Sequence, residues 1–336
     1  MVKLLFAVED ALAVLTESAN GCRCNFALSG RRPQCVAVDP RRPQLAYCGT
    51  FDDGLWRSED GGVNWRPAGS GIAHPRVLSV ATNPWSRDDR GIVYAGTEPS
   101  AVFRSEDGGS TWSECTGLTD LPSARTWSFP PRPSTHHVRW LAMDDHRQGR
   151  LFAAIEAGAL VQSQDDGQTW RDRVPGGPRD THQLALHHSS RDRLYSAAGD
   201  GYFESRDGGE TWQRPVEGLR HTYTWSVAVD QGDANNVILS CAASPQRSHG
   251  EPAESFIYRR QASQPWHELG GGLPSPSGRR TAVLAAHPRR ENTFFAVWEE
   301  DVFRSSDGGE SWKKLETPEL RGRPFNESCA LIVVEE

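Results

Sequence analysis

The chain of 336 residues carries one eight-residue pattern five times, and this repetition limits the folds that it can adopt. A sixth segment, RRQASQPW, keeps only the final tryptophan, Trp266. The six tryptophans follow one another at intervals of 42 to 58 residues, a period that fits four short strands per unit. Apolar alternation and Gly-rich turns agree with strands, and no long helical pattern occurs. The repetition predicts an all-β propeller. The five full copies are SEDGGVNW, SEDGGSTW, SQDDGQTW, SRDGGETW and SSDGGESW, ending at Trp65, Trp112, Trp170, Trp212 and Trp312.

Each copy has the composition of a tight turn between two strands. Glycines such as Gly62 and Gly109 accept a positive φ, and aspartates such as Asp60 and Asp107 accept hydrogen bonds from the backbone of the turn. The pattern Ser-x-Asp-x-Gly-x-Thr-Trp resembles the Asp-box (BNR) repeat of sialidases, sortilin-type receptors and photosystem II assembly factors. This resemblance implies a propeller over nearly the whole chain, with the boxes on its rim, between the third and fourth strands of each blade and away from the ligand site.

The strands between the turns predict a single domain, residues 1–336, of seven four-stranded antiparallel blades. Six blades are read directly from the repeats. For the seventh, the C-terminus supplies an innermost strand, CALIVVEE, and the N-terminus supplies LLFAVED, ALAVLTES and CNFALSG as the second, third and fourth strands. A blade shared between the termini closes the ring and removes exposed sheet edges.

Composition narrows the classes of partner and the cellular compartment. The net charge is −7 and no run of Lys or Arg occurs, so neither nucleic acid nor an anionic membrane is expected as the main partner. The N-terminal stretch contains Glu9 and Asp10 and lacks a cleavage site, so it is expected to be folded structure. Seven cysteines, an odd number, argue against a full disulfide framework. We expect a cytoplasmic protein.

A funnel at one face of the ring is the expected ligand site. In propellers, the loop before the innermost strand and the loop between the second and third strands open on the same face. Many polar side chains fall in these positions, where they contribute little to folding. Those at or near the start of innermost strands are Arg76, His137, Arg139, Asp180, His182, Arg220, His221, Tyr223, Trp225 and Arg280, and the acids after second strands include Glu98, Glu156, Asp200 and Glu299.

These residue types predict the binding of a small polar or anionic ligand, with a lean toward hydrolase or lyase chemistry, as in glycosidases. Arg139 and Arg220 would hold an anionic part, and His137 and His182 would move protons. The carboxylates Glu98, Glu156 and Asp200 would orient the ligand or protonate it. Isolated histidines, His249 among them, are expected to be structural. The alternative is a non-catalytic binding or assembly scaffold that docks a protein partner on the propeller face.

Three further expectations concern the same face. No cofactor is required, although His137, His182 and His221 come from consecutive blades and would suit a divalent or transition metal. A classical sialidase is not expected, because the Arg-Ile-Pro stretch of that family is absent. The long insertion at 113–140 is expected on the channel-mouth face, either as a lid with Trp127 and Phe129 facing the channel or as a partner-binding strip that exposes them.

Overall fold

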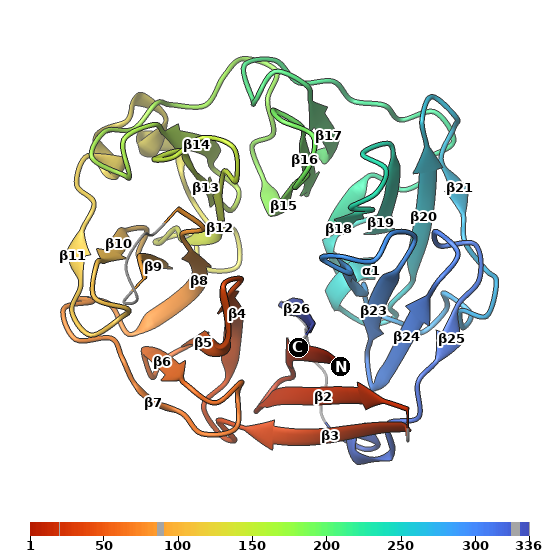
Figure 1. The fold of residues 1–336 in the computed structure, drawn as a ribbon. Helices are drawn as coiled ribbons and strands as arrows, with labels where there is room; N and C mark the ends of the chain where they lie inside the picture. Colours follow the sequence, from red (N-terminus) through yellow and green to blue (C-terminus); the bar gives the residue numbers. More distant parts are fainter. Residues whose placement is uncertain (20, 86–90, 324–329, 336) are drawn as a thin grey trace.

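A computed structural model describes residues 1–19, 21–85, 91–323 and 330–335. Seven antiparallel sheets are arranged in a ring around a central channel, and both chain termini lie in one blade (Figure 1). The predicted seven-bladed propeller is confirmed, and with it the predicted closure: β26 pairs with β1. Of the strand predicted from CALIVVEE, residues 329 and 336 lie outside the described residues.

The blades follow the chain in order around the ring. Blade 1 contains β26 (Leu331–Glu335), β1 (Val2–Ala7), β2 (Leu12–Ser18) and β3 (Gly21–Ala27). Blade 2 contains β4 (Pro33–Asp39), β5 (Arg42–Thr50), β6 (Leu55–Ser58) and β7 (Arg66–Pro67). Blade 3 contains β8 (Arg76–Thr82), β9 (Val93–Glu98), β10 (Val102–Ser105) and β11 (Ser113–Glu114). Blade 4 contains β12 (Val138–Met143), β13 (Leu151–Ile155) and β14 (Ala159–Ser163).

The remaining blades complete the ring. Blade 5 contains β15 (Thr181–Leu186), β16 (Leu194–Ala198) and β17 (Gly201–Ser205). Blade 6 contains β18 (Tyr223–Val229), β19 (Asn236–Ala242), β20 (Ser255–Gln261) and β21 (His267–Glu268). Blade 7 contains β22 (Val283–Ala286), β23 (Phe294–Trp298), β24 (Asp301–Ser305) and β25 (Lys313–Lys314). In blades 4 and 5 a single bridge, Gln162 with Arg171 and Glu204 with Gln213, takes the place of the fourth strand. The helices are η1 (Leu118–Asp120), η2 (Pro122–Thr126), α1 (Pro245–His249) and η3 (Pro318–Leu320).

The second strands of blades 3 to 7 are buried along their whole length because each is covered by neighbouring blades on both faces. Every residue of β9, β13, β16, β19 and β23 is buried, which explains why these segments read as continuous apolar runs. Close packing near the axis also requires glycine. A Cβ added to Gly96 would lie 2.6 Å from Cγ1 of Val138 in the next blade, well inside van der Waals contact.

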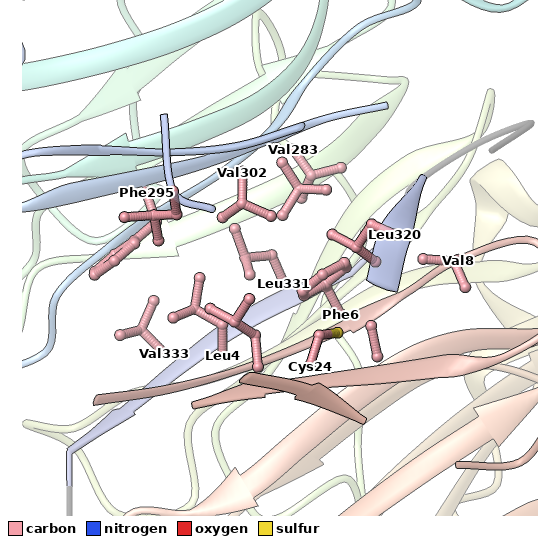
Figure 2. Packing of buried hydrophobic residues seen from close by; sticks show 14 of the residues in the cluster. Leu4, Phe6, Val8, Cys24, Val283, Phe295, Val302, Leu320, Leu331 and Val333 are labelled. Atoms are coloured by element: carbon pink, nitrogen blue, oxygen red, sulfur yellow. The ribbon is translucent and has the colours of Figure 1, made fainter. Parts of the chain in front are cut away.

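The shared blade packs against blade 7 through apolar side chains. Figure 2 shows Leu4 and Phe6 of β1, Val333 of β26 and Phe295 of β23 in one cluster, and the first two and Phe295 are fully buried. Strands from the two ends of the chain therefore contribute to one core, so the ring is closed by packing as well as by backbone hydrogen bonds.

The five repeated turns share one hydrogen-bond pattern. In the turn after β10, the Ser105 hydroxyl donates to Asp107 Oδ1 at 2.8 Å and accepts the Gly109 N–H at 2.8 Å. The same Asp107 oxygen accepts the N–H of Thr111 at 2.9 Å. Equivalent bonds occur in the turns at Asp60, Asp165, Asp207 and Asp307. Serine and aspartate thus satisfy backbone groups that the sharp turn leaves unpaired.

The long insertion at 113–140 contains η1 and η2 and turns back at a bridge between Phe129 and Arg132. Trp127 is buried in the apolar cluster between blades 3 and 4, and its indole N–H donates to Ser123 Oγ at 3.1 Å. Phe129 instead lines the channel mouth. One of the two aromatic residues therefore anchors the insertion and the other faces the channel. Among the described residues, none of the helices has the length and apolar character needed to cross a bilayer.

Candidate functional site

A cavity of about 290 Å³ opens at the mouth of the channel, and blades 1, 2, 3, 4 and 6 and the insertion contribute to its wall. This volume is at the lower end of the range for small-molecule sites. Its wall combines apolar rings with charged groups that are otherwise rare inside a protein. The lining residues are Val8, Glu9, Arg32, Pro33, Gln34, Phe51, Leu78, Phe129, Arg132, His137, Arg139, Glu156 and Trp225.

Glu156 lies at the centre of the polar part of this wall, directly after β13. His137, the residue before β12, is 2.7 Å from Glu156 Oε2 through its Nε2 atom, and Arg139 Nε is 3.5 Å from the same oxygen. Burial by itself would raise the pKa of Glu156. The hydrogen bond from His137, together with the charges of His137, His182 and Arg139, outweighs burial and holds this pKa well below its usual range. Glu156 is therefore a carboxylate at neutral pH.

His182, on β15, presents one ring nitrogen to two carboxylates. Its Nδ1 atom is 2.7 Å from the carbonyl oxygen of Thr224, and since a carbonyl only accepts, Nδ1 carries the proton. The other ring nitrogen, Nε2, lies 3.9 Å from Glu156 Oε1 and 3.8 Å from Asp180 Oδ1. The ring packs against Trp225, with centroids 4.6 Å apart, and is 1% exposed.

Asp180, just before β15, is the carboxylate with the opposite pKa shift. Its Oδ1 atom accepts the N–H of Ala157 at 2.5 Å. Burial raises its pKa, and the charge of Glu156 adds to this effect, while the charge of His182 opposes it. Asp200 fixes the backbone just before β15 by hydrogen bonds. Its carboxylate accepts the N–H groups of Arg179 and Asp180 at 3.2 and 3.3 Å. Asp200 therefore orders the backbone that carries Asp180.

Glu98, at the end of β9, is fully engaged by cations. Arg76 donates to Oε1 at 2.9 Å, and Arg132 from the insertion donates to both carboxylate oxygens, at 2.9 and 2.6 Å. His137 Nδ1 lies 3.6 Å away on the other side. Burial would raise the pKa of Glu98, but the arginines and His137 lower it overall. Because its proton is lost well below neutral pH, Glu98 is poorly suited to act as a general acid.

Arg139 has the least satisfied charge of the group. It is 8% exposed, and its guanidinium lies over the ring of Trp225, 4.8 Å from the centroid. Its Nε atom has no hydrogen-bond partner among the described residues, and its ion pair with Glu156 is long, at 3.5 Å. A buried guanidinium with an idle donor is unusual, because each donor lost from water must be compensated.

Four of the residues expected in the funnel have other partners. Arg220 is mostly exposed and pairs with Glu268 of β21 at 2.5 Å. His221 stacks on Phe256 of β20, with ring centroids 4.3 Å apart, whereas His137 and His182 both face Glu156. On blade 7, Glu299 Oε1 accepts the backbone N–H of Arg280 at 3.4 Å, and the Arg280 side chain reaches Glu251 at 3.2 Å.

The remaining predicted residues lie at the channel mouth. Trp225 lines the cavity beneath Arg139, and Tyr223 lies against the ring of His182, with centroids 5.1 Å apart. Arg76 contributes from the side through its bond to Glu98. The structure thus brings Glu98, His137, Arg139, Glu156, Asp180, His182 and Trp225 into one connected group.

Sequence reasoning overlooked two residues of this neighbourhood. Arg132 was not expected beside Glu98, since no strand pattern places the tip of an insertion. His249 of α1, expected to be an isolated structural residue, lies over Trp225 with ring centroids 4.3 Å apart and is hydrogen-bonded to the Tyr223 hydroxyl at 3.1 Å. Burial lowers the pKa of His249 to about 3, so the ring is neutral at physiological pH. Its position between second and third strands, on the channel-mouth side, was the available signal.

Comparison with known proteins supports the fold at low sequence identity. No protein-family model and no curated protein matches the chain. Similar solved structures include an ancestral GH74 enzyme, with TM-score 0.66 and 16% identity, over 84% of this chain and 38% of that one. YCF48 bound to D1 peptide aligns with TM-score 0.63 and 16% identity, over 91% of this chain and 94% of that one. A nidogen/laminin complex aligns with TM-score 0.55 and 9% identity, over 100% and 99% of the two chains. At such identities the likeness shows a shared propeller fold, and no more.

Proposed function

We propose that the channel-mouth cavity binds a small anionic molecule, such as a carboxylate or a phosphate ester. The observation that carries this proposal is Arg139, a buried guanidinium in the cavity wall whose Nε atom has no hydrogen-bond partner among the described residues. A planar guanidinium binds carboxylate or phosphate oxygens with paired hydrogen bonds, and a ligand of this kind would satisfy its idle donor. Trp225, beneath the guanidinium, keeps it in place.

The groups next to Arg139 favour a reaction of the hydrolase or lyase class on the bound molecule. Glu156 is an ionised carboxylate, Asp180 has a raised pKa, and the Nε2 atom of His182 lies within 4 Å of both carboxylates. Titratable groups with pKa values pushed apart at one cavity are typical of proton-transfer sites. Glu98 takes the role of a positioning residue, because its carboxylate fixes Arg132 and faces His137.

The proposal is tested by measuring anion binding to the purified chain with isothermal titration calorimetry, using citrate and inorganic phosphate as probes. We expect Arg139→Gln to weaken binding of the better probe at least 10-fold, since a charge-assisted bidentate contact is worth about 1.5–3 kcal/mol. The matched control is Arg220→Gln, because Arg220 is exposed and paired with Glu268 on the outer strands. Equal affinities in wild type and Arg139→Gln would refute the assignment, and a loss in Arg220→Gln would move the site to the outer strands.

A protein partner is the second candidate, and the likeness to YCF48 bound to D1 peptide over nearly the whole of both chains favours it. In that case the anion would be a peptide carboxylate seated on Arg139. Fluorescence anisotropy of labelled peptides with free and amidated C-termini separates the two candidates. Tight binding of free-acid peptides that is lost in Arg139→Gln, with only weak citrate and phosphate binding, would identify a docking protein.

A further inference from the structure

Three potential metal ligands converge beside the cavity on adjacent blades. Glu156 follows the second strand of blade 4, Asp180 precedes the innermost strand of blade 5, and His182 lies in that strand. One carboxylate oxygen of each acid and the Nε2 atom of His182 all lie within 4.8 Å of one another. This grouping differs from the set expected from the sequence, in which His137 and His221 joined His182.

The orientation of the His182 ring indicates that its Nε2 atom is positioned to bind a ligand. Its Nδ1–H donates to the carbonyl of Thr224, which is the hydrogen bond that fixes the ring of a metal-binding histidine with the lone pair of Nε2 outward. That Nε2 atom has no hydrogen-bond partner among the described residues, because the two carboxylate oxygens are 3.8 and 3.9 Å away. A ring that is 1% exposed therefore directs its Nε2 atom toward two acids.

Both acids are held so that one oxygen remains available. The Oε2 atom of Glu156 is bound by His137 at 2.7 Å, which leaves Oε1 facing His182. Asp180 is positioned by the N–H of Ala157 on its Oδ1 atom, which has a further lone pair. Hydrogen bonds of this kind to the ligating carboxylates are characteristic of protein metal sites. The Asp180 side chain is 27% exposed, which gives an ion a path from solvent.

Distances and charge are compatible with a small cation at the centre of the three atoms. Metal–ligand bonds of about 2.0–2.2 Å place neighbouring ligand atoms roughly 3.0–3.5 Å apart, so closure around an ion requires shifts of about half an ångström. Two carboxylates that lie this close together also repel each other. A divalent cation would remove that repulsion.

We infer that Glu156, Asp180 and His182 form a binding site for a divalent transition-metal ion. One imidazole and two carboxylates suit Zn²⁺ or Mn²⁺, and such a three-residue set leaves coordination positions open for water or substrate oxygen. The inference goes beyond the proposed function, since it stands on the geometry of the three ligands. It also places the ion on the opposite side of Glu156 from Arg139, next to the anion-binding cavity.

The test is Mn²⁺ binding to chelator-stripped full-length protein, followed by the loss of the electron paramagnetic resonance signal of free Mn²⁺. We expect one site per chain that Zn²⁺ displaces, with affinity reduced at least 10-fold in Asp180→Asn and in His182→Gln. The control is His188→Gln, which removes an exposed imidazole paired with Asp145 at 2.8 Å and should leave the affinity unchanged. Absence of Mn²⁺ and Zn²⁺ binding up to about 1 mM, the range of the weakest protein cation sites, would overturn the inference. So would unchanged binding in both variants.

Thermal melting gives a second readout that does not depend on activity. Mn²⁺ should raise the melting temperature of wild type and His188→Gln but not of Asp180→Asn, a nearly isosteric change at a partly exposed side chain. If His182→Gln does not fold, Asp180→Asn decides. Failure here is distinguishable from failure of the proposed function. Anion binding without Mn²⁺ binding overturns only the metal site, whereas Mn²⁺ binding without any Arg139-dependent anion binding overturns only the anion site.

Discussion

At the scale of single residues, side chains of the same type have different roles because their partners differ. Glu98 ends β9 and Asp180 precedes β15, both at the channel mouth, yet the pKa of Glu98 is lowered by arginines and that of Asp180 is raised by burial. The sequence pattern predicted that both acids lie at the channel-mouth end of their strands. It did not reveal that Arg132, from the tip of an insertion, would pair with Glu98. Strand periodicity predicts which face a residue occupies, whereas an ion pair depends on loop conformation.

We expect Glu98→Gln to reduce stability rather than to remove an acid group. The carboxylate is 3% exposed and bonded to Arg76 and Arg132, so its loss leaves two guanidinium groups near an uncharged amide. Breaking a buried pair costs about 3–5 kcal/mol, and since both arginine side chains are about one-third exposed, a loss of about 2 kcal/mol is expected here. Urea denaturation measures it. Unchanged stability combined with lost anion binding would instead make Glu98 a ligand-binding residue.

At the scale of elements, the repeated turn was predictable because its bonds are local. Serine, aspartate and glycine lie within five positions of each other, so sequence spacing alone defines the hydrogen-bond pattern. The insertion was predicted less completely. Its position followed from the long gap between turns, but Trp127 packs between blades 3 and 4 while Phe129 faces the cavity. Composition cannot separate two aromatic residues whose roles depend on the direction of each side chain.

The turn after β10 offers a quantitative test. Asp107→Ala removes an acceptor for Ser105, Ser110 and Thr111 and should destabilise the chain by about 1–2 kcal/mol, as does the loss of a comparable capping aspartate. Thermal or urea denaturation gives the difference. Glu106→Ala, at an exposed position of the same turn, is the control and should change stability by less than about 0.5 kcal/mol. Equal effects of the two substitutions would contradict a structural role for the aspartate.

The contribution of this turn also depends on pH, with a defined sign. Hydrogen bonds from Thr111 and Ser105 outweigh partial burial and lower the pKa of Asp107 to about 2. A folded-state pKa below the unfolded value of about 3.9 stabilises the fold above pH 4, and this contribution is lost as the pH falls toward 2. The stability difference between wild type and Asp107→Ala should therefore shrink over that interval. A difference that stays constant from pH 6 to pH 2 would contradict the assignment.

At the scale of the whole molecule, blade number and ring closure were predictable. Turns at a regular period indicate the number of blades, and the strands at the two chain ends that belong to no other blade must pair with each other. The channel-mouth group was predictable only in part. Innermost strands place His137, Arg139 and His182 at or near the channel mouth, but the convergence of Glu156, Asp180 and His182 depends on how adjacent blades are rotated about the axis. His221 shows what strand alignment does not predict. It lies two residues before β18, and its ring stacks on Phe256 of β20.

Closure of the ring makes the two ends of the chain one cooperative unit. Val333 of β26 packs with Leu4 of β1 and Phe295 of blade 7 and is 7% exposed, so Val333→Ala should cost about 2 kcal/mol through lost burial and a cavity. Because blade 1 contains both termini, the whole urea transition should move to lower concentration while remaining single. Tryptophan fluorescence and far-ultraviolet circular dichroism should report the same midpoint. The control is Val216→Ala, at a side chain 48% exposed, which should leave the midpoint unchanged. An early, separate transition in Val333→Ala would show that blade 1 opens independently and that the shared strand is not coupled to the rest of the ring.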